Sequence, residues 1–204
     1  LVHAAARGEL ETMRTLLDGG ADPDSDDGAL TALARAAANR RVDALGLLLA
    51  RGAGADMRCP PTSRAAGRSA LHFAAQAGPP AAVRALLDAR ADASASAADR
   101  AMSVPIDCIG AHTVGADSVR ALLHAALIEV ADLGGTLHLL TASSRRWRKA
   151  HCLLLPTQVR AYTDASLTHA LGGIGSASAY PADEHSLGGR ASRAPTAHML
   201  QLVS

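Results

Sequence analysis

Aromatic residues are nearly absent from this chain of 204 residues. They make up 2% of the sequence, although 49% of it is hydrophobic and alanine is abundant. With so few large aromatic side chains, a wide and thick core is not expected. The composition favours thin layers of closely approaching helices, as in solenoids, where each repeat contacts only its neighbours.

Cysteine, net charge and long apolar runs are also scarce, and each absence excludes a class of protein. The three cysteines, Cys59, Cys108 and Cys152, are far apart and form no C-x-x-C pair, so neither a disulfide framework nor a zinc site is expected. A formal net charge of +1 gives no electrostatic reason for nucleic acid or an anionic membrane as the main partner. No apolar run approaches the roughly 20 residues of a membrane span, and the start shows no signal-peptide pattern. We therefore expect a cytoplasmic protein without a membrane anchor, with the nucleus as the alternative.

A repeated pattern organises about the first 125 residues. Counted from Leu71, glycine follows at +7, apolar residues follow at +12, +15 and +16, and an Ala-Asp pair follows at +20 and +21. The same offsets hold from Leu1. From Leu33 they hold as far as Ala53, with Arg40 in place of the glycine. A fourth, degenerate copy begins at Ile106 and runs one residue late. Each copy predicts two short helices, which are marginal alone and must be stabilised by stacking.

The length of the unit and its opening motif point to a known family. A repeat near 33 residues with two helices is the ankyrin signature, with T-P-L-H-x-A at its start. Partial matches to this motif occur at residues 69–74 (SALHFA), 31–36 (TALARA) and 104–109 (VPIDCI). The chain therefore resembles the ankyrin-repeat family. The resemblance implies an all-α solenoid of four to five helix-turn-helix repeats with short hairpin fingers, which acts as a monomeric, non-catalytic scaffold or adaptor for a protein partner and needs no cofactor.

The pattern also suggests boundaries along the chain. We expect an ankyrin repeat domain at 1–130, a degenerate fifth repeat or C-terminal cap at 131–162, and a low-complexity, flexible tail at 163–204, where Gly, Ser and Ala dominate. Leu1 lies inside the opening motif of the first repeat without an initiator Met, which predicts a fragment of a longer protein.

Two of the expected fingers are unusual. Residues 22–27 (DPDSDD) are acidic, but the spaced ligands and distal Glu of an EF-hand loop are missing, so a solvated hairpin tip is favoured over a calcium site. Residues 57–67 contain an insertion with Pro60 and Pro61 that predicts a lengthened, irregular finger. Such a loop is a candidate for carrying specificity.

A second resemblance gives the alternative function. Residues 153–162 (LLLPTQVRAY) are similar to the L-P-L-P-x-x-L-x-x-Y end of the SOCS box, which implies a substrate-recruiting adaptor of a ubiquitin ligase through residues 136–162. The sequence departs from that box upstream, where Leu137 is followed four residues later by Thr141 instead of Cys.

The binding surface is predicted from the repeat register. Offsets +2, +5 and +6 lie on the first helix of each repeat, on the side away from the second helix, and should line a concave groove. The candidate protein-binding residues at these offsets are His3, Arg7, Arg35, Asn39, Phe73, Gln76 and His112. Phe73 with Arg35 is the best candidate for an energetic hot spot.

An enzyme is not expected. Cys108 and His112 are four residues apart and would share one face of a helix, as a thiol nucleophile and its base would need. However, the equivalent positions in the other repeats share no chemistry, and no catalytic or metal-binding signature occurs elsewhere.

Overall fold

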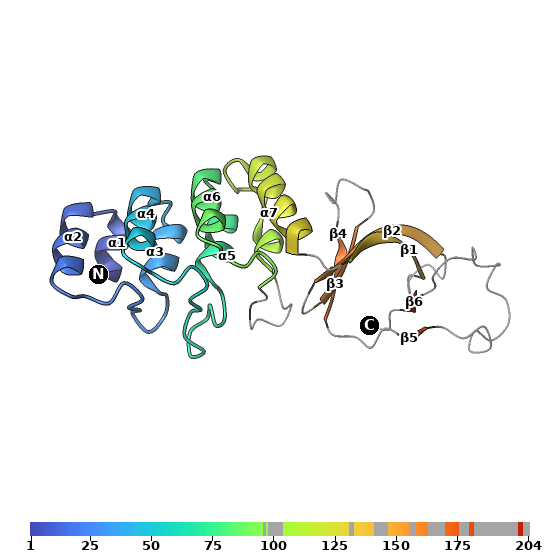
Figure 1. Ribbon diagram of the computed structural model, residues 1–204, viewed down its shortest axis with the longest axis horizontal. Coiled ribbons are helices and arrows are strands. Elements are labelled where there is room, and N and C mark those ends of the chain that lie inside the picture. The colour runs from blue at the N-terminus through green and yellow to red at the C-terminus, as the bar shows by residue number, and fades with distance from the viewer. Residues whose placement is uncertain are drawn as a thin grey trace. The chain divides into compact units, whose positions relative to one another are not determined.

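The computed structural model describes residues 1–95, 97, 104–130, 133–140, 147–155, 158–162, 170–175, 180–181 and 200–201, with side chains up to residue 129. The chain divides into two compact units, Leu1–Glu129 and Val130–Ser204 (Figure 1).

The first unit consists of stacked helix pairs. The pairs are α1 (Val2–Arg7) with α2 (Leu10–Asp18), α3 (Ala32–Ala38) with α4 (Val42–Ala50), and α5 (Ala70–Ala77) with α6 (Pro80–Asp88). The first helices α1, α3 and α5 pack on one another, and the second helices α2, α4 and α6 form a second layer (Figure 1). The predicted helical solenoid is confirmed in this unit.

Small side chains set the spacing of the inner layer. Offsets +3 and +4 are alanine in all three repeats, and all six are buried: Ala4, Ala5, Ala36, Ala37, Ala74 and Ala75. Because alanine projects only one methyl group, neighbouring helices can approach closely and still exclude water. The core thus consists of thin layers of small side chains, which agrees with the shortage of aromatic residues in the sequence.

The outer layer contains the larger core residues. Met13, Leu45 and Val83, all at offset +12, are fully buried. Offset +15 differs along the stack: Leu48 and Leu86 are 0% exposed, whereas Leu16 is 37% exposed. In the second and third repeats, the second helix packs against the second helix of the repeat before it, α4 against α2 and α6 against α4.

The helix ends repeat their backbone geometry even where the residue type changes. Positive φ angles recur at offsets +7 and +19, at Gly8, Arg40, Gly78, Gly20, Gly52 and Arg90. Glycine adopts such angles without a steric penalty, whereas a residue with a Cβ atom is disfavoured there. Arg40 and Arg90 therefore hold strained conformations, with φ of 59° and 67°.

The fourth repeat opens as the others do but does not continue as an α-helix. The carboxylate Oδ2 of Asp107 accepts a hydrogen bond from the Val104 amide at 3.1 Å, as Nδ1 of buried His72 does from the Ser69 amide at the same distance. Only a four-residue 3-10 helix, η1 (Pro105–Cys108), follows, since Ile109 is extended with ψ 112°. The prediction of a first α-helix in this repeat is therefore wrong beyond Cys108.

The second helix of the fourth repeat is longer than its equivalents. α7 (Ala116–Val130) has 15 residues, and Val119, Leu123 and Leu127 are fully buried along one face at a spacing of four. This spacing gives the helix a continuous apolar stripe.

The second unit contains an antiparallel sheet of order β1-β2-β3-β4. Its strands are β1 (Leu133–Leu140), β2 (Trp147–Leu155), β3 (Gln158–Tyr162) and β4 (Ala170–Gly175), and β5 (Tyr180–Pro181) pairs separately with β6 (Leu200–Gln201). Cys152 on the central strand β2 pairs with Gly135 on one side and Ala161 on the other.

These strands correct the expectation of a helical fifth repeat or cap at 131–162. Gly134 and Gly135 stand at its start, and glycine disfavours a helix interior by about 1 kcal/mol per residue relative to alanine. Part of the predicted tail at 163–204 also forms strands, namely β4, β5 and β6; its other residues lie outside the described ones.

Candidate functional site

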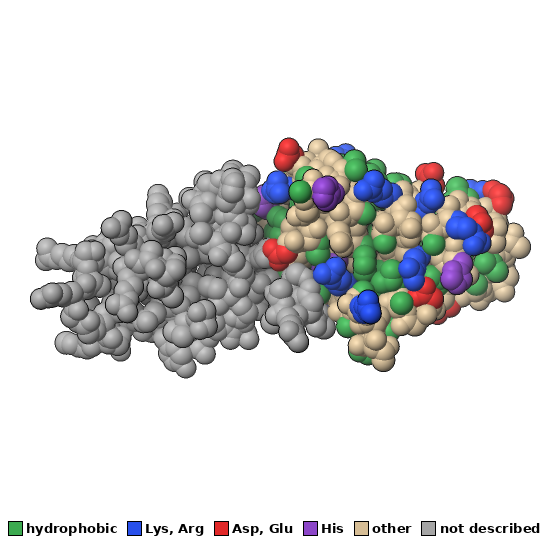
Figure 2. All heavy atoms as spheres, turned by 180° about the vertical axis from the view of Figure 1, so that it is seen from behind, with side chains coloured by type: hydrophobic (Ala, Val, Ile, Leu, Met, Phe, Trp, Pro, Cys, Tyr) green, Lys and Arg blue, Asp and Glu red, His purple; other side chains and the backbone are tan. Residues whose placement is uncertain are grey.

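The side chains at offsets +2 and +6 emerge from the buried alanine layer on one side. His3, Arg7 and Asn39 are exposed, and Arg35 and Phe73 are half-buried. Because residues +3 and +4 of each helix point into the stack, residues +2 and +6 turn toward solvent. We call this surface of α1, α3 and α5 the inner-helix face. On the side of the unit shown in Figure 2, cationic and histidine side chains are spread along the repeats with hydrophobic surface between them.

Arg35 is held in place by the first finger. Its guanidinium donates a hydrogen bond to the carboxylate of Asp27, and the two side chains are 31% and 18% exposed. Asp27 Oδ1 also accepts from the amides of Leu30 at 2.8 Å and Ala29 at 3.0 Å. Burial opposes ionisation of Asp27, but these hydrogen bonds outweigh it and lower its pKa to about 2. The positive charge of Arg35 is therefore fixed in orientation and partly neutralised.

Arg7 also has an acidic partner on its own turn. Its Nε lies 2.5 Å from Oε1 of Glu9, and its Nη2 lies 3.1 Å from Oε2. The hydrogen bond between them raises the pKa of Arg7 and lowers the pKa of Glu9. The pair is exposed to solvent, so it orients the guanidinium more than it stabilises the fold.

Gln76 connects α5 with the second finger and with the turn before α7. Its Oε1 lies 3.5 Å from Nη1 of Arg68 in the second finger, and its backbone oxygen accepts a hydrogen bond from Oγ1 of Thr113 at 2.8 Å. Asn39, one repeat earlier, donates from Nδ2 to the backbone oxygen of Arg35 at 2.8 Å. The polar residues of the inner-helix face are thus held by local hydrogen bonds.

His112 does not lie on a helix, whereas the other predicted site residues lie on α1, α3 or α5 or, for Asn39, at the C-cap of α3. It is exposed in the turn 111–115, whereas Cys108 lies in η1, where its Sγ is 3.9 Å from the Val104 oxygen. The helical spacing that would join Cys108 and His112 is therefore absent. The other six candidates are spread over the successive first helices α1, α3 and α5, with Asn39 at the C-cap of α3, and His112 lies beyond the end of this row.

The comparison with protein families now identifies the three stacked helix pairs. Residues 1–97 match the family model described as "Ankyrin repeats (3 copies)". This part of the chain is an ankyrin repeat domain. The matched residues contain the helix pairs α1–α2, α3–α4 and α5–α6, and ankyrin repeats are modules of protein–protein interaction. A search of the curated proteins finds no match to the chain. Within the described residues, no helix is long and apolar enough to cross a membrane.

The acidic first finger of the ankyrin domain uses its carboxylates to bind backbone amides. Asp22 Oδ1 accepts from the Asp24 amide at 2.9 Å, and Asp24 Oδ1 accepts from the Gly54 amide of the next repeat at 2.8 Å. The same link recurs one repeat later, where Asp56 Oδ1 accepts from the Asp92 amide at 2.8 Å. Among the described residues, no group of three or more His, Cys, Asp or Glu side chains could hold a metal ion. The aspartates therefore join neighbouring fingers.

The second finger is a closed hairpin despite its insertion. The Cys59 amide donates to the Arg68 oxygen at 2.9 Å, and the Gly67 amide donates back to the Cys59 oxygen at 3.2 Å. Cys59 itself is buried, and this burial raises the pKa of its thiol. The exposed Arg64 lies in the loop that the hairpin closes.

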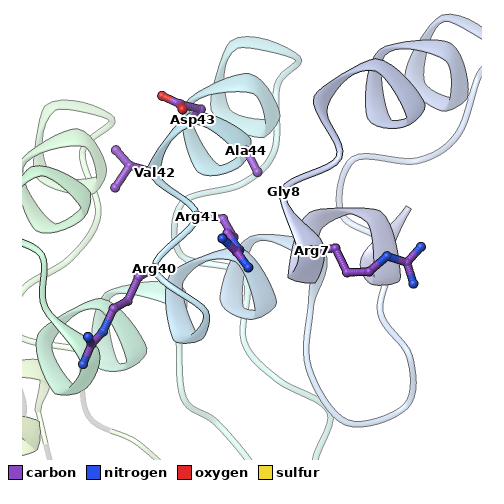
Figure 3. A pocket seen from close by; sticks show the side chains of 7 residues that line it. All are labelled: Arg7, Gly8, Arg40, Arg41, Val42, Asp43 and Ala44. Atoms are coloured by element: carbon purple, nitrogen blue, oxygen red, sulfur yellow. The ribbon is translucent and has the colours of Figure 1, made fainter.

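Sequence reasoning missed a cleft between the first two ankyrin repeats. It has a volume of about 320 Å³ and lies where the first helices turn into the second helices (Figure 3). Its lining residues are Arg7, Gly8, Arg40, Arg41, Val42, Asp43 and Ala44. The available signal was the Arg40-Arg41 pair at a turn where the neighbouring repeats have glycine.

Proposed function

We propose that the ankyrin domain binds an extended segment of a partner protein along the inner-helix face. The contact residues are those at the variable offsets, with His112 at the far end: His3, Arg7, Arg35, Asn39, Phe73, Gln76 and His112. The observation that supports this proposal most is the contrast within each helix. Offsets +3 and +4 repeat as buried alanine, whereas the exposed offsets carry cationic, polar and aromatic side chains that differ between repeats.

Phe73 and Arg35 form the proposed centre of this interface. Both stand at offset +2, on the packed helices α5 and α3, and both are half-buried before a partner binds. The contact of Arg35 with Asp27 keeps its side chain ordered, so less rotamer entropy is lost on binding. Aromatic and arginine side chains dominate the energetics of protein interfaces, and their truncation typically costs about 2 kcal/mol or more.

The proposal is tested by affinity capture followed by quantitative binding of the captured partner. We expect Phe73→Ala and Arg35→Ala to weaken that binding by roughly 30-fold or more, which corresponds to 2 kcal/mol. Arg84→Ala is the matched control, because Arg84 is an exposed arginine on the outer helix α6. Binding that survives both inner-helix changes would move the interface to the second finger.

A more specific hypothesis, that the chain is a ubiquitin-ligase adaptor, rests on the sequence of residues 153–162 alone. It is tested by substituting Leu155 and Tyr162, the ends of β2 and β3, together with Pro156. If the chain is such an adaptor, the substituted variant should no longer co-purify with elongin and cullin proteins, although its ankyrin domain stays folded. Co-purification that is absent in the wild type rejects this alternative.

A further inference from the structure

The second finger carries a charge opposite to that of the first. Residues 57–68 contain three arginines and neither Asp nor Glu, whereas residues 22–27 of the first finger contain four aspartates and neither Lys nor Arg. The two fingers are neighbours, because Asp24 in the first accepts a hydrogen bond at 2.8 Å from the Gly54 amide just before the second (Figure 1). A partner segment that crosses both fingers therefore meets opposite charges in a fixed order.

The hairpin of the second finger fixes where its arginines lie. Arg58 forms an antiparallel bridge with Ser69, and its Nη1 donates to the Gly67 oxygen at 2.9 Å across the hairpin. Arg64 is exposed in the loop that the hairpin closes. The bridge also brings Arg68, the residue before Ser69, to the base of the hairpin beside Arg58. Positive charge therefore extends from the base of the finger to its loop.

Arg68 connects this basic finger to the inner-helix face. Its Nη1 lies 3.5 Å from Oε1 of Gln76 on α5. Phe73 stands three residues before Gln76 on the same helix, and residues at this spacing are neighbours on the helix surface. Phe73 is half-buried, so part of its side chain is accessible to a partner. An arginine of the second finger thus contacts the same stretch of helix surface that presents an aromatic ring.

This combination favours an acidic protein segment over a nucleic acid. Arginine pairs with carboxylates through two parallel hydrogen bonds, and an aromatic ring offers a contact for an apolar side chain. A nucleic acid is negatively charged along its whole length, so the four aspartates of the first finger would repel it next to the basic finger.

We propose that the second finger and α5 bind an acidic segment of the partner protein, with its carboxylates at Arg58, Arg64 and Arg68 and an apolar residue on Phe73. This inference rests on the proposed function and names the chemistry of the segment that the inner-helix face binds. Electrostatic complementarity of this kind sets the specificity and the association rate of an interface more than its total affinity.

The probe is a fluorescently labelled peptide of alternating Glu and Leu, and its binding to the full chain is followed by fluorescence anisotropy. We expect saturable binding that weakens as sodium chloride is added, because salt screens exposed charge pairs. The same peptide with Gln in place of every Glu should bind at least about tenfold more weakly. Equal binding of the two peptides would overturn the proposal.

Arg64→Glu and Arg84→Glu form a matched pair of variants. Both change the net charge equally, but Arg64 lies in the loop of the second finger and Arg84 is exposed on the outer helix α6. Arg64→Glu should weaken binding of the Glu-Leu peptide by roughly tenfold, and Arg84→Glu should leave it unchanged. A Lys-Leu peptide should bind Arg64→Glu more tightly than the wild type. Equal losses in the two variants would contradict a site on the second finger.

The partner captured in the test of the proposed function separates the two claims. If its binding depends on Phe73 and Arg35 but is unchanged in Arg64→Glu, the inner-helix interface stands and the acidic segment is rejected. Binding that survives Phe73→Ala and Arg35→Ala but is lost in Arg64→Glu rejects the inner-helix interface and keeps the acidic preference of the second finger. A single-stranded RNA that binds more tightly than the Glu-Leu peptide would also overturn the proposal.

Discussion

Two leucines at the same repeat offset allow the stacking argument to be tested quantitatively. Leu86 on α6 is 0% exposed, whereas Leu16 on α2 is 37% exposed. Truncation of Leu86 to alanine removes buried methyl and methylene groups and leaves a cavity, so Leu86→Ala should lower the free energy of unfolding by about 2–5 kcal/mol. Leu16→Ala should lower it by only about 1–1.5 kcal/mol, because water can occupy the space left behind and part of the side chain was never buried.

The assay is urea unfolding followed by the helical circular dichroism signal, which reports on the first unit because the strands lie in the second. The midpoint should fall for Leu86→Ala by at least about twice as much as for Leu16→Ala, with similar slopes for both variants. Leu48→Ala, at the same offset and also fully buried, should resemble Leu86→Ala. Equal losses for Leu16→Ala and Leu86→Ala would refute the view that each helix pair covers offset +15 of the next.

Three further predictions concern contacts and strain within the ankyrin domain. The pKa of Asp27 is lowered to about 2 from an ordinary 3.8, so its contribution to stability is present above about pH 4 and is lost as the pH falls toward 2. Asp27→Asn should therefore show a smaller loss of stability than the wild type over that interval in acid unfolding, and an identical profile would contradict this. Asp24→Ala removes the acceptor of the Gly54 amide and should cost about 1–2 kcal/mol, with faster hydrogen exchange at that amide as the direct readout. Arg40→Gly and Arg90→Gly should each leave the free energy of unfolding unchanged or raise it by up to about 1 kcal/mol, which thermal unfolding would detect. The reason is that relief of the positive φ offsets the added freedom of the unfolded chain. Arg40→Ala keeps a Cβ atom and should therefore bring no gain.

The inner-helix face and the cleft differ in how far each could be predicted from sequence. Phe73 and Arg35 share an offset from their anchors, so the periodicity alone placed them on one face of packed helices. The contact of Arg41 with Ala6 joins residues that are 35 positions apart, and no local pattern records it. The cleft that this contact helps to form was therefore beyond sequence reasoning.

Sequence by itself determined the helix pairs, their order and their buried faces, because these depend on neighbours within one turn or one repeat. The offset of Gly8 and Gly78 even predicted the turn at Arg40, whose positive φ the repeat imposes on a residue that disfavours it. Tertiary structure alone decided the end of η1 after Cys108, the exposure of Leu16 and the strands of the second unit. The reason is physical: β2 is specified by the pairing of Cys152 with Gly135 and Ala161, and such partners are chosen by packing between distant segments rather than by the spacing of apolar residues within one.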